Sequence, residues 1–350
     1  MDRLSEYRRE MKGLCFTPEQ KAALAARVRA AAQERSHAAR RPMRWVLAAA
    51  SVAVIFATGY GAVAAGLVGN AFDSVFGTSQ TEVINKIGRP IGAGATDNGI
   101  TVTADAIIGD KYSACIVYTV KRKDGSPLRL PAGISIQNLS FEDFGGSDLH
   151  GGDGLHGSVG FLPSSTDKNA AQYVESISAN GPLKLGKVNA RFHNMQYFDP
   201  KSQRTVTFCK GDWNFSFRVK YEDSSVALKA GETFTRDGST FKITKISVSP
   251  VALHMEYEAE GAYGSKEETS SSDGSEPDSV KKRSEHYLGL SVLLTKKDGS
   301  VLNLTDNGGS IDSSGGKTVC TKGGVFREIV PIEEMKSVSV QGVEIPVGSD

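Results

Sequence analysis

One uninterrupted apolar run constrains this chain more than any other feature of its sequence. From Trp45 to Val68 no residue is charged. As a helix that rises about 1.5 Å per residue, the run is long enough to cross a hydrocarbon core of about 30 Å. A buried core helix would normally be shorter and would carry a polar stripe. The run therefore predicts a transmembrane helix at 45–68.

Arginines flank this run on its N-terminal side. Arg40, Arg41 and Arg44 lie directly before it, whereas the first basic residues after it are Lys86 and Arg89. Positive charge collects on the cytoplasmic side of a membrane span, so these three arginines set the topology. We therefore expect a single-pass protein of the cell membrane, in contact with lipid, with a cytoplasmic N-terminus and extracellular C-terminal domains.

One other interpretation of the run, and one property of the predicted span, stay open. The tripeptide Ala-Val-Ala at 62–64 resembles a signal-peptide cleavage site, although a cleavable signal would begin within a few residues of Met1. Small residues at Ala57, Gly61 and Ala65 are spaced by four, which permits close contact between two such helices. A weak homodimer through the span is therefore a possible partnership.

The segment before the run, residues 1–44, is short and basic, with eleven Lys and Arg against five Asp and Glu. Thr17 and Pro18 are typical of a helix start, and apolar residues recur at helical spacing on both sides of them. The candidate partner-binding residues in these apolar stripes are Leu4, Tyr7, Met11, Leu14, Leu24 and Val28. Two helices this short bury little against each other. The stripes either bind a cytosolic protein or belong to a partly ordered tail that only sets topology.

After the run the pattern changes to short alternating segments separated by Gly, Asp, Asn and Ser. Alternation at 100–108 and again at 112–120, with Gly109-Asp110 between them, predicts two strands joined by a turn. A similar order recurs later, with a turn at Asp237-Gly238 and a second KDGS at 297–300. The surplus in the second copy, 264–285, is polar and charged and predicts a solvated loop.

These patterns predict a mainly β protein with a short N-terminal helical segment, one transmembrane helix and two tandem immunoglobulin-like β-sandwich domains. The first extracellular domain is expected at 82–225 and the second at 226–350. A stalk at 69–81, with room for a short helix, would join them to the span. Phe72 and Phe76 in this stalk are expected at the membrane surface, where aromatic side chains gather.

Motifs for catalysis and cofactor binding are missing from the sequence. We find no convincing Gly-x-Ser-x-Gly, phosphate loop or paired Cys-x-x-Cys, and we predict no enzyme and no cofactor. A net charge of +1 gives no indication of nucleic-acid binding. Cys115, Cys209 and Cys320 allow at most one disulfide outside the membrane, and Cys115 is expected as a small core residue.

One glycine-rich loop, residues 144–161, holds potential metal ligands. They are Asp148, His150, Asp153 and His156. So much glycine leaves ligands poorly held, so we favour a hairpin loop without metal and predict no metal site.

Several stretches resemble a known family. FTPEQKAALAARVRAAA at 16–32, the arginine-flanked span and NGITVTADAIIGDKYSACIVYTV at 98–120 are similar to bacterial proteins that carry a domain of unknown function shared with membrane-bound anti-sigma factors. KISVSPVALHMEYEAE at 245–260 and EEMKSVSVQGVEIPV at 333–347 resemble the immunoglobulin-like domain that often follows it.

The resemblance implies a membrane-anchored regulator. Its inner segment would hold an extracytoplasmic-function sigma factor, and its outer domains would sense envelope signals through an unknown extracellular ligand or protein. The chain lacks the zinc-binding signature of better understood anti-sigma factors, so the signal does not carry over. The alternative is a cell-surface binding or structural module for which the N-terminal helix is only an anchor.

Overall fold

The computed structural model describes residues 68–149, 154–261 and 278–348. This part of the chain is mainly β, with several antiparallel sheets, as the sequence predicts. The predicted cytoplasmic segment at 1–44, and all of the predicted span except Val68, lie outside it. Among the described helices, none is both long and apolar enough to cross a membrane. The transmembrane helix therefore stays a prediction.

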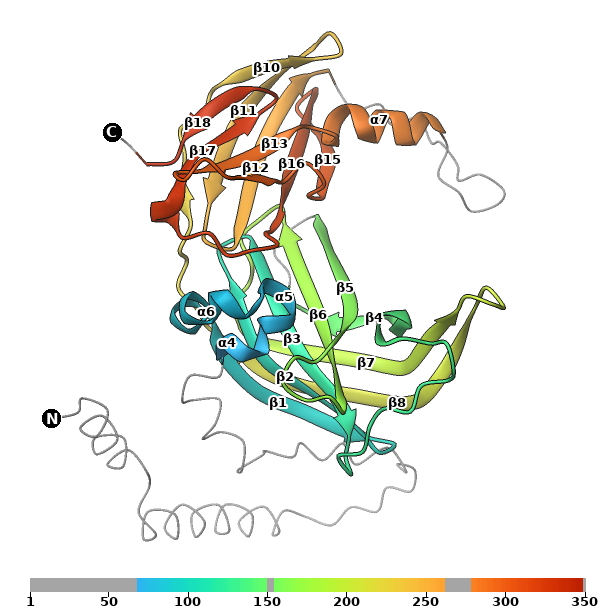
Figure 1. Cartoon of the computed structure of the whole chain (residues 1–350). Coiled ribbons are helices and arrows are strands. Elements are labelled where there is room, and N and C mark those ends of the chain that lie inside the picture. Colours follow the sequence, from blue (N-terminus) through green and yellow to red (C-terminus); the bar gives the residue numbers. More distant parts are fainter. Residues whose placement is uncertain (1–67, 150–153, 262–277, 349–350) are drawn as a thin grey trace, which may run out of the picture. The chain divides into compact units, whose positions relative to one another are not determined.

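Two antiparallel sheets form the first lobe, which we define as residues 89–221 (Figure 1). One sheet has the order β1-β2-β3-β6-β5, made of β1 (Arg89–Asp97), β2 (Ile100–Gly109), β3 (Ser113–Arg122), β6 (Ala170–Ala179) and β5 (Leu155–Pro163). The other has the order β4-β7-β8, made of β4 (Leu139–Ser147), β7 (Gly186–Asp199) and β8 (Arg204–Val219), with the 3-10 helix η3 (Ile136–Asn138) before it. Aromatic rings such as Phe141, Tyr173 and Trp213 fill the core. Trp213 Nε1 donates to the Ile100 carbonyl at 2.9 Å, which ties the two sheets together.

Two more antiparallel sheets form the second lobe, residues 226–347. The larger has the order β10-β11-β12-β16-β15, made of β10 (Thr233–Arg236), β11 (Ser239–Val248), β12 (Ala252–Glu260), β16 (Lys317–Val325) and β15 (Gly309–Ser314), and β9 (Val226–Ala227) also pairs with β11. The smaller has the order β14-β13-β17-β18, made of β14 (Val301–Asn303), β13 (Val292–Lys296), β17 (Met335–Val340) and β18 (Val343–Pro346), with the 3-10 helix η4 (Ile332–Glu334) before β17. A separate hydrophobic core fills this lobe. The immunoglobulin-like assignment and the domain limits at 82–225 and 226–350 stay predictions.

Hairpin turns follow directly from the sequence. The two-residue turns Asn98-Gly99, Asp237-Gly238 and Gln341-Gly342 have positive φ at both positions, between 43° and 84°. This conformation suits glycine and asparagine and matches the twist of the flanking strands. The predicted turn at Asp237-Gly238 is confirmed.

Both KDGS segments also fold alike. In each, the aspartate side chain accepts hydrogen bonds from the backbone N–H and the hydroxyl of the serine two residues on, Asp124 from Ser126 and Asp298 from Ser300. This local side-chain bond is the reason that the tetrapeptide specifies a turn in both places.

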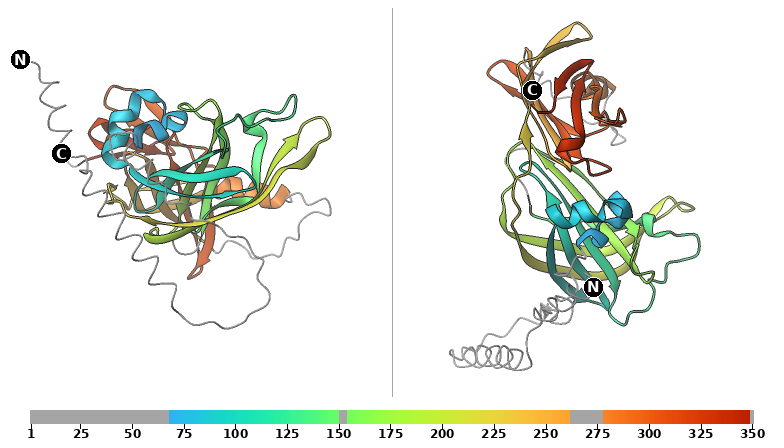
Figure 2. Two further views of the ribbon diagram at one scale, coloured as in Figure 1. Left: turned by 90° about the horizontal axis from the view of Figure 1, so that it is seen from below. Right: turned by 60° about the vertical axis from the view of Figure 1, so that its left-hand side comes forward.

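Short helices occupy the interval that the sequence predicts as a stalk. They are α4 (Val68–Ala71), α5 (Asp73–Phe76), the 3-10 helix η2 (Thr78–Gln80) and, overlapping the start of the predicted first domain, α6 (Thr81–Ile87). Figure 1 and Figure 2 show these helices lying across one face of the first sheet. The expected spacer is thus a packed helical layer, because its apolar residues find the outer face of that sheet.

A helix also replaces part of the predicted polar loop. Residues 262–277 lie outside the described structure, but α7 spans Asp278–Leu288. The loop prediction at 264–285 is therefore wrong at its C-terminal end. Tyr287 and Leu288 pack against the core of the second lobe. These tertiary contacts hold the helix in place, and its polar sequence does not predict them.

Candidate functional site

The residues predicted to bind a cytosolic partner lie outside the described structure. They are Leu4, Tyr7, Met11, Leu14, Leu24 and Val28, and the topology-setting Arg40, Arg41 and Arg44 lie outside it as well. The site that the structure does describe begins where the predicted span ends, at Val68.

A buried apolar cluster, which we call the junction core, joins three parts of the chain. Its members are Val68, Phe72, Phe76, Ile84, Ala106, Ile108, Cys115, Val117, Val251, Ala252 and Ile329. The first four come from the helices, the next four from β2 and β3, and the last three from the second lobe. Phe72 and Phe76 are therefore buried in protein, and their expected place at the membrane surface is wrong.

Two glutamine side chains lock the helices in place. Gln80 makes a two-way bond with the backbone of Ile329 in the second lobe: its Nε2 donates to the carbonyl at 2.9 Å and its Oε1 accepts from the N–H at 2.6 Å. Gln172 on β6 donates to the Ala71 carbonyl at 3.0 Å and accepts from the Ser74 hydroxyl. The helices are thus bonded to the first lobe and to the second.

The turn between β2 and β3 makes a further contact with the second lobe. Tyr112 stacks on His254, with ring centroids 3.7 Å apart and planes at 9°. Lys245 Nζ lies 4.7 Å from the centroid of the Tyr112 ring. The buried Asp110 carboxylate shapes this turn by accepting the N–H groups of Tyr112 and Ser113, each at 2.8 Å. Burial raises the pKa of Asp110, while a hydrogen bond from Ser249 of the second lobe opposes that rise.

Charge around His254 is balanced locally. Glu256 accepts from His254 Nε2 at 3.1 Å and from Lys245 Nζ at 2.7 Å. The bond from His254 is the largest cause that lowers the pKa of Glu256 to about 2. The Glu256 carboxylate therefore compensates the charge of the Lys245 ammonium at the contact between the lobes.

The opposite edge of the first sheet reaches the second lobe through β5 and the chain after β6. His156 Nε2 lies 3.1 Å from the Gly323 carbonyl, and Ser310 donates to the Asn180 side chain at 2.8 Å. Within the described residues, the lobes are thus joined at the junction core, the Tyr112 stack and the His156 contact.

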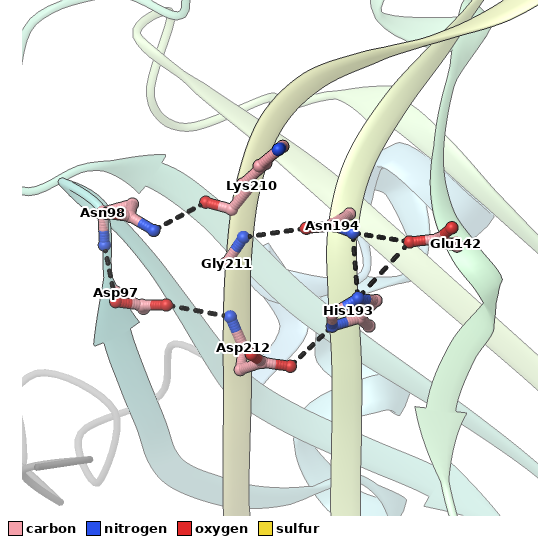
Figure 3. Close-up of polar contacts among 8 residues, drawn as sticks. All are labelled: Asp97, Asn98, Glu142, His193, Asn194, Lys210, Gly211 and Asp212. Carbon is pink, nitrogen blue, oxygen red and sulfur yellow. Dashed lines mark hydrogen bonds and ion pairs between the residues drawn. The ribbon is translucent and has the colours of Figure 1, made fainter. Parts of the chain in front are cut away.

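Another polar cluster lies within the first lobe, on β4, β7 and β8 (Figure 3). His193 Nδ1 lies 2.5 Å from Asp212 Oδ1, and His193 Nε2 lies 3.4 Å from Glu142 Oε2. Asn194 Nδ2 approaches both Glu142 Oε2, at 2.6 Å, and His193 Nε2, at 2.9 Å. We call these four residues the His193 cluster.

Irregular pairing produces this cluster. The β7–β8 register shifts between His193 and Met195, and the β4–β7 register shifts on both sides of Glu142. Backbone bonds fix the surroundings: Gly211 N–H donates to Asn194 Oδ1 at 3.1 Å, and Asp212 N–H donates to Asp97 Oδ2 at 2.9 Å. The cluster therefore pins three strands, and β1 beside them, at the point where their regular ladder is interrupted.

The chemistry of the His193 cluster is proton exchange. When the ring is neutral, Nε2 accepts from the Asn194 amide, and when it is protonated, Nε2 donates to Glu142. The polar groups on the ring are two carboxylates and an amide, so this arrangement can hold a proton on the ring. The hydrogen bond to Asp212 is the largest cause that raises the pKa of His193.

We expect Asp212→Asn to lower the pKa of His193 towards the ordinary histidine value of about 6.5. The substitution keeps the shape of the side chain and removes its charge, so the imidazolium loses its closest counter-charge. An NMR titration of the histidine side chains measures the change.

The matched control for that titration is Asp237→Asn, which acts on His286, 3.3 Å away, and should leave His193 unchanged. An unaltered His193 titration in the Asp212→Asn variant would show that the bond to Asp212 does not raise its pKa.

Of the four potential metal ligands in the glycine-rich loop, the two that the structure describes contact different parts of the protein. Asp148 accepts from the backbone and side chain of Asn189, whereas His156 contacts Gly323. His150 and Asp153 lie outside the described residues. Across the described ranges, no group of three or more His, Cys, Asp and Glu side chains is placed to hold a metal ion.

The three cysteines in the described residues, Cys115, Cys209 and Cys320, are free thiols. Cys115 is buried, as predicted. Burial raises its pKa to about 12, which keeps it an unreactive thiol.

Sequence reasoning did not single out the His193 cluster, although a signal exists. Val188, Ala190 and Phe192 keep one parity along β7, and the next buried residue is Met195. Such a change of parity marks a bulge. The partners of His193 on β4 and β8 have no such local signal.

Residues 38–122 match the family model described as a domain of unknown function, DUF4179. A structure described as the crystal structure of the conserved domain protein from Bacillus anthracis is similar with a TM-score of 0.46 and 17% identity, over 73% of this chain and 77% of that chain. Among curated proteins, none matches the chain. The family match runs from before the predicted span to the end of β3 and includes the helices of the junction core.

Proposed function

We propose that this chain is a single-pass membrane regulator of the anti-sigma type, without enzymatic activity. Its N-terminal segment holds an extracytoplasmic-function sigma factor on the cytoplasmic side, and its two β lobes respond to envelope signals on the other side. The observation that supports this proposal is the junction core, which connects the first residues after the predicted span to both lobes.

The junction core would couple the helices after the span to both lobes. Phe72 and Ile84 are fully buried against β2, β3 and the second lobe, and Gln80 is bonded to Ile329. A change in either lobe must therefore shift or release the helices that follow the span. Close-packed cores respond to such changes by moving between discrete arrangements, which is how a signal passes along a chain.

A transcription reporter that depends on the sigma factor tests the proposal. Deleting residues 1–36 while keeping the span should release the reporter fully, because the apolar stripes that hold the sigma factor are removed. A matched variant, Leu24→Asp with Val28→Asp in the full chain, should do the same without shortening the protein. A reporter that neither change affects would overturn the proposal.

The alternative is a cell-surface binding or structural module with an N-terminal anchor. In that case adhesion or surface assembly should survive deletion of residues 1–36, and no sigma factor should co-purify with the full-length protein. The same deletion therefore separates the two functions.

The bond between Gln80 and Ile329 gives a stability prediction. Gln80→Met keeps the length of the side chain and removes both hydrogen bonds, which leaves the N–H and C=O of the buried Ile329 without this partner. We expect a loss of about 1–3 kcal/mol in the free energy of unfolding, the usual cost of buried backbone groups that lose their partner. Urea unfolding of the purified full-length protein measures it.

The control for this measurement is Gln137→Met in η3, where the side chain is exposed. It should change the free energy of unfolding by less than about 0.5 kcal/mol. Equal effects of the two substitutions would mean that the Gln80 bond adds nothing to stability.

A further inference from the structure

His156 occupies an unusual place in the contact between the lobes. It lies on β5, at the edge of the first sheet, and its Nε2 contacts the Gly323 carbonyl of β16. Because a carbonyl oxygen only accepts, Nε2 must carry the hydrogen. The other ring nitrogen, Nδ1, is buried and has no hydrogen-bond partner. A bare Nδ1 means that the ring is neutral in this arrangement.

The loop before β15 packs closely against the Cδ2 side of this ring. A Cβ added to Gly308 would lie 2.9 Å from His156 Cδ2, so glycine at 308 is what allows the loop before β15 to approach. A proton added to Nδ1 would create a buried N–H donor without an acceptor. Such a group is costly, and its positive charge adds to the cost.

The charges around His156 also disfavour a proton. Burial is the largest cause that lowers the pKa of His156, and the hydrogen bond to the Gly323 carbonyl opposes it. His254 and Lys322, both from the second lobe, lower this pKa further. Strand β5 itself contains no charged residue. Two carboxylates on neighbouring strands have other partners: Glu256 on β12 bonds with His254 and Lys245, and Glu175 on β6 bonds with Tyr118 and Ser147. Burial lowers the pKa of Lys322, and the negative charge of Asp306 opposes this change.

We propose that acidification loosens the contact between the two lobes by protonating His156. The open form lets the imidazolium reach water, so it binds the proton more tightly than the closed form does. The contact is therefore fully stable above the ordinary histidine pKa of about 6.5 and weakens as the pH falls below it. The pH response of the contact does not depend on the proposed function. Its biological role does rest on it, since an acidic exterior would then be a signal that the regulator detects.

The other described histidines with carboxylate partners do not share this property. His254 has Glu256 beside it, and in the His193 cluster both ring nitrogens have acceptors in the protonated state. His193 therefore provides an internal control: it titrates without forcing any contact open.

Hydrogen exchange on the full-length protein tests the proposal. Between about pH 8 and about pH 5, after correction for the intrinsic rate, peptides covering β5 and residues 320–326 should exchange about threefold to tenfold faster. Peptides from the middle of β3 should not change, which separates opening of the contact from unfolding. In His156→Gln, which stays neutral and can still donate to Gly323, the acceleration should disappear, and in His193→Gln it should remain.

These exchange measurements decide whether protonation of His156 loosens the contact between the lobes, and they need no functional assay. Equal acceleration in the wild type and in His156→Gln would overturn the proposal, as would no acceleration in the wild type. If His156→Gln opens the contact at every pH, an NMR titration of His156 in the wild type decides instead. A midpoint shared with the exchange change supports the proposal, and a separate midpoint refutes it. A sigma-factor reporter that ignores deletion of residues 1–36 would refute the proposed function and leave this result intact.

Discussion

Phe72→Ala is expected to destabilise the protein by about 3–5 kcal/mol, the range for truncating a fully buried aromatic ring. Phe72 is 0% exposed, and its ring lies 5.8 Å from that of Phe76 in the junction core. The loss combines the apolar surface of the ring with the cavity that it leaves between the helices and the first sheet. Chemical unfolding of the full-length protein measures the change.

The control for Phe72 is Phe198→Ala. Phe198 lies at the end of β7 and is 41% exposed, so its truncation should cost less than about 1 kcal/mol. If Phe72→Ala costs no more than this control, the helices are not packed as the structure describes.

The Phe72 variant also bears on coupling. If the helices carry changes from the lobes to the span, Phe72→Ala should alter the sigma-factor reporter even under conditions in which the protein remains folded. Phe198→Ala should leave the reporter unchanged. An unaffected reporter in a folded Phe72→Ala protein would count against the junction core as the route of signalling.

Lys322→Met is expected to lower the free energy of unfolding by about 2–4 kcal/mol, because a buried ammonium is lost and three backbone carbonyls lose their shared partner. Lys322 is 2% exposed, and its ammonium donates to the backbone carbonyls of Leu288, Thr305 and Asn307 at 2.7–2.8 Å. These carbonyls belong to the end of α7 and to the loop before β15. A methionine of similar length packs in the same space but supplies no donor.

The matched control is Lys317→Met on the same strand. Lys317 pairs with Glu258 at 2.7 Å, and its side chain is 39% exposed. Ion pairs exposed to water contribute little to stability, so the control should have a much smaller effect than Lys322→Met. Hydrogen exchange adds a local measurement, since only Lys322→Met should accelerate exchange at the C-terminal end of α7. Equal effects of the two variants would contradict the role of the buried ammonium.

Much of the fold could be predicted from local sequence. Alternation at 100–108 and 112–120 predicts β2 and β3 closely, and the Asp-Gly and KDGS segments predict their turns. Such signals work because they depend on neighbours in the chain: an inward residue every second position, an aspartate that bonds two residues ahead, and a glycine that accepts positive φ.

The candidate site was much harder to predict. Phe72 and Phe76 follow an apolar run, so the sequence favours a place at the membrane surface. In the folded protein they pack against β2 and β3 instead, and only the tertiary structure shows that this surface is available to them. Helix α7 was missed for a related reason, because its sequence is polar and its support comes from the second lobe.

Patterns among neighbouring residues are enough to identify the long apolar run, the arginines that precede it, the mainly β character of the rest and the positions of its turns. Tertiary structure alone decided that Gln80 meets Ile329, that Tyr112 stacks on His254 and that Nδ1 of His156 is buried without a partner. The residues that meet in the first two contacts are more than a hundred positions apart in the chain, and so are His156 and its partner Gly323. Whether distant residues meet is set by how the sheets and lobes pack, and no pattern among neighbours encodes that packing.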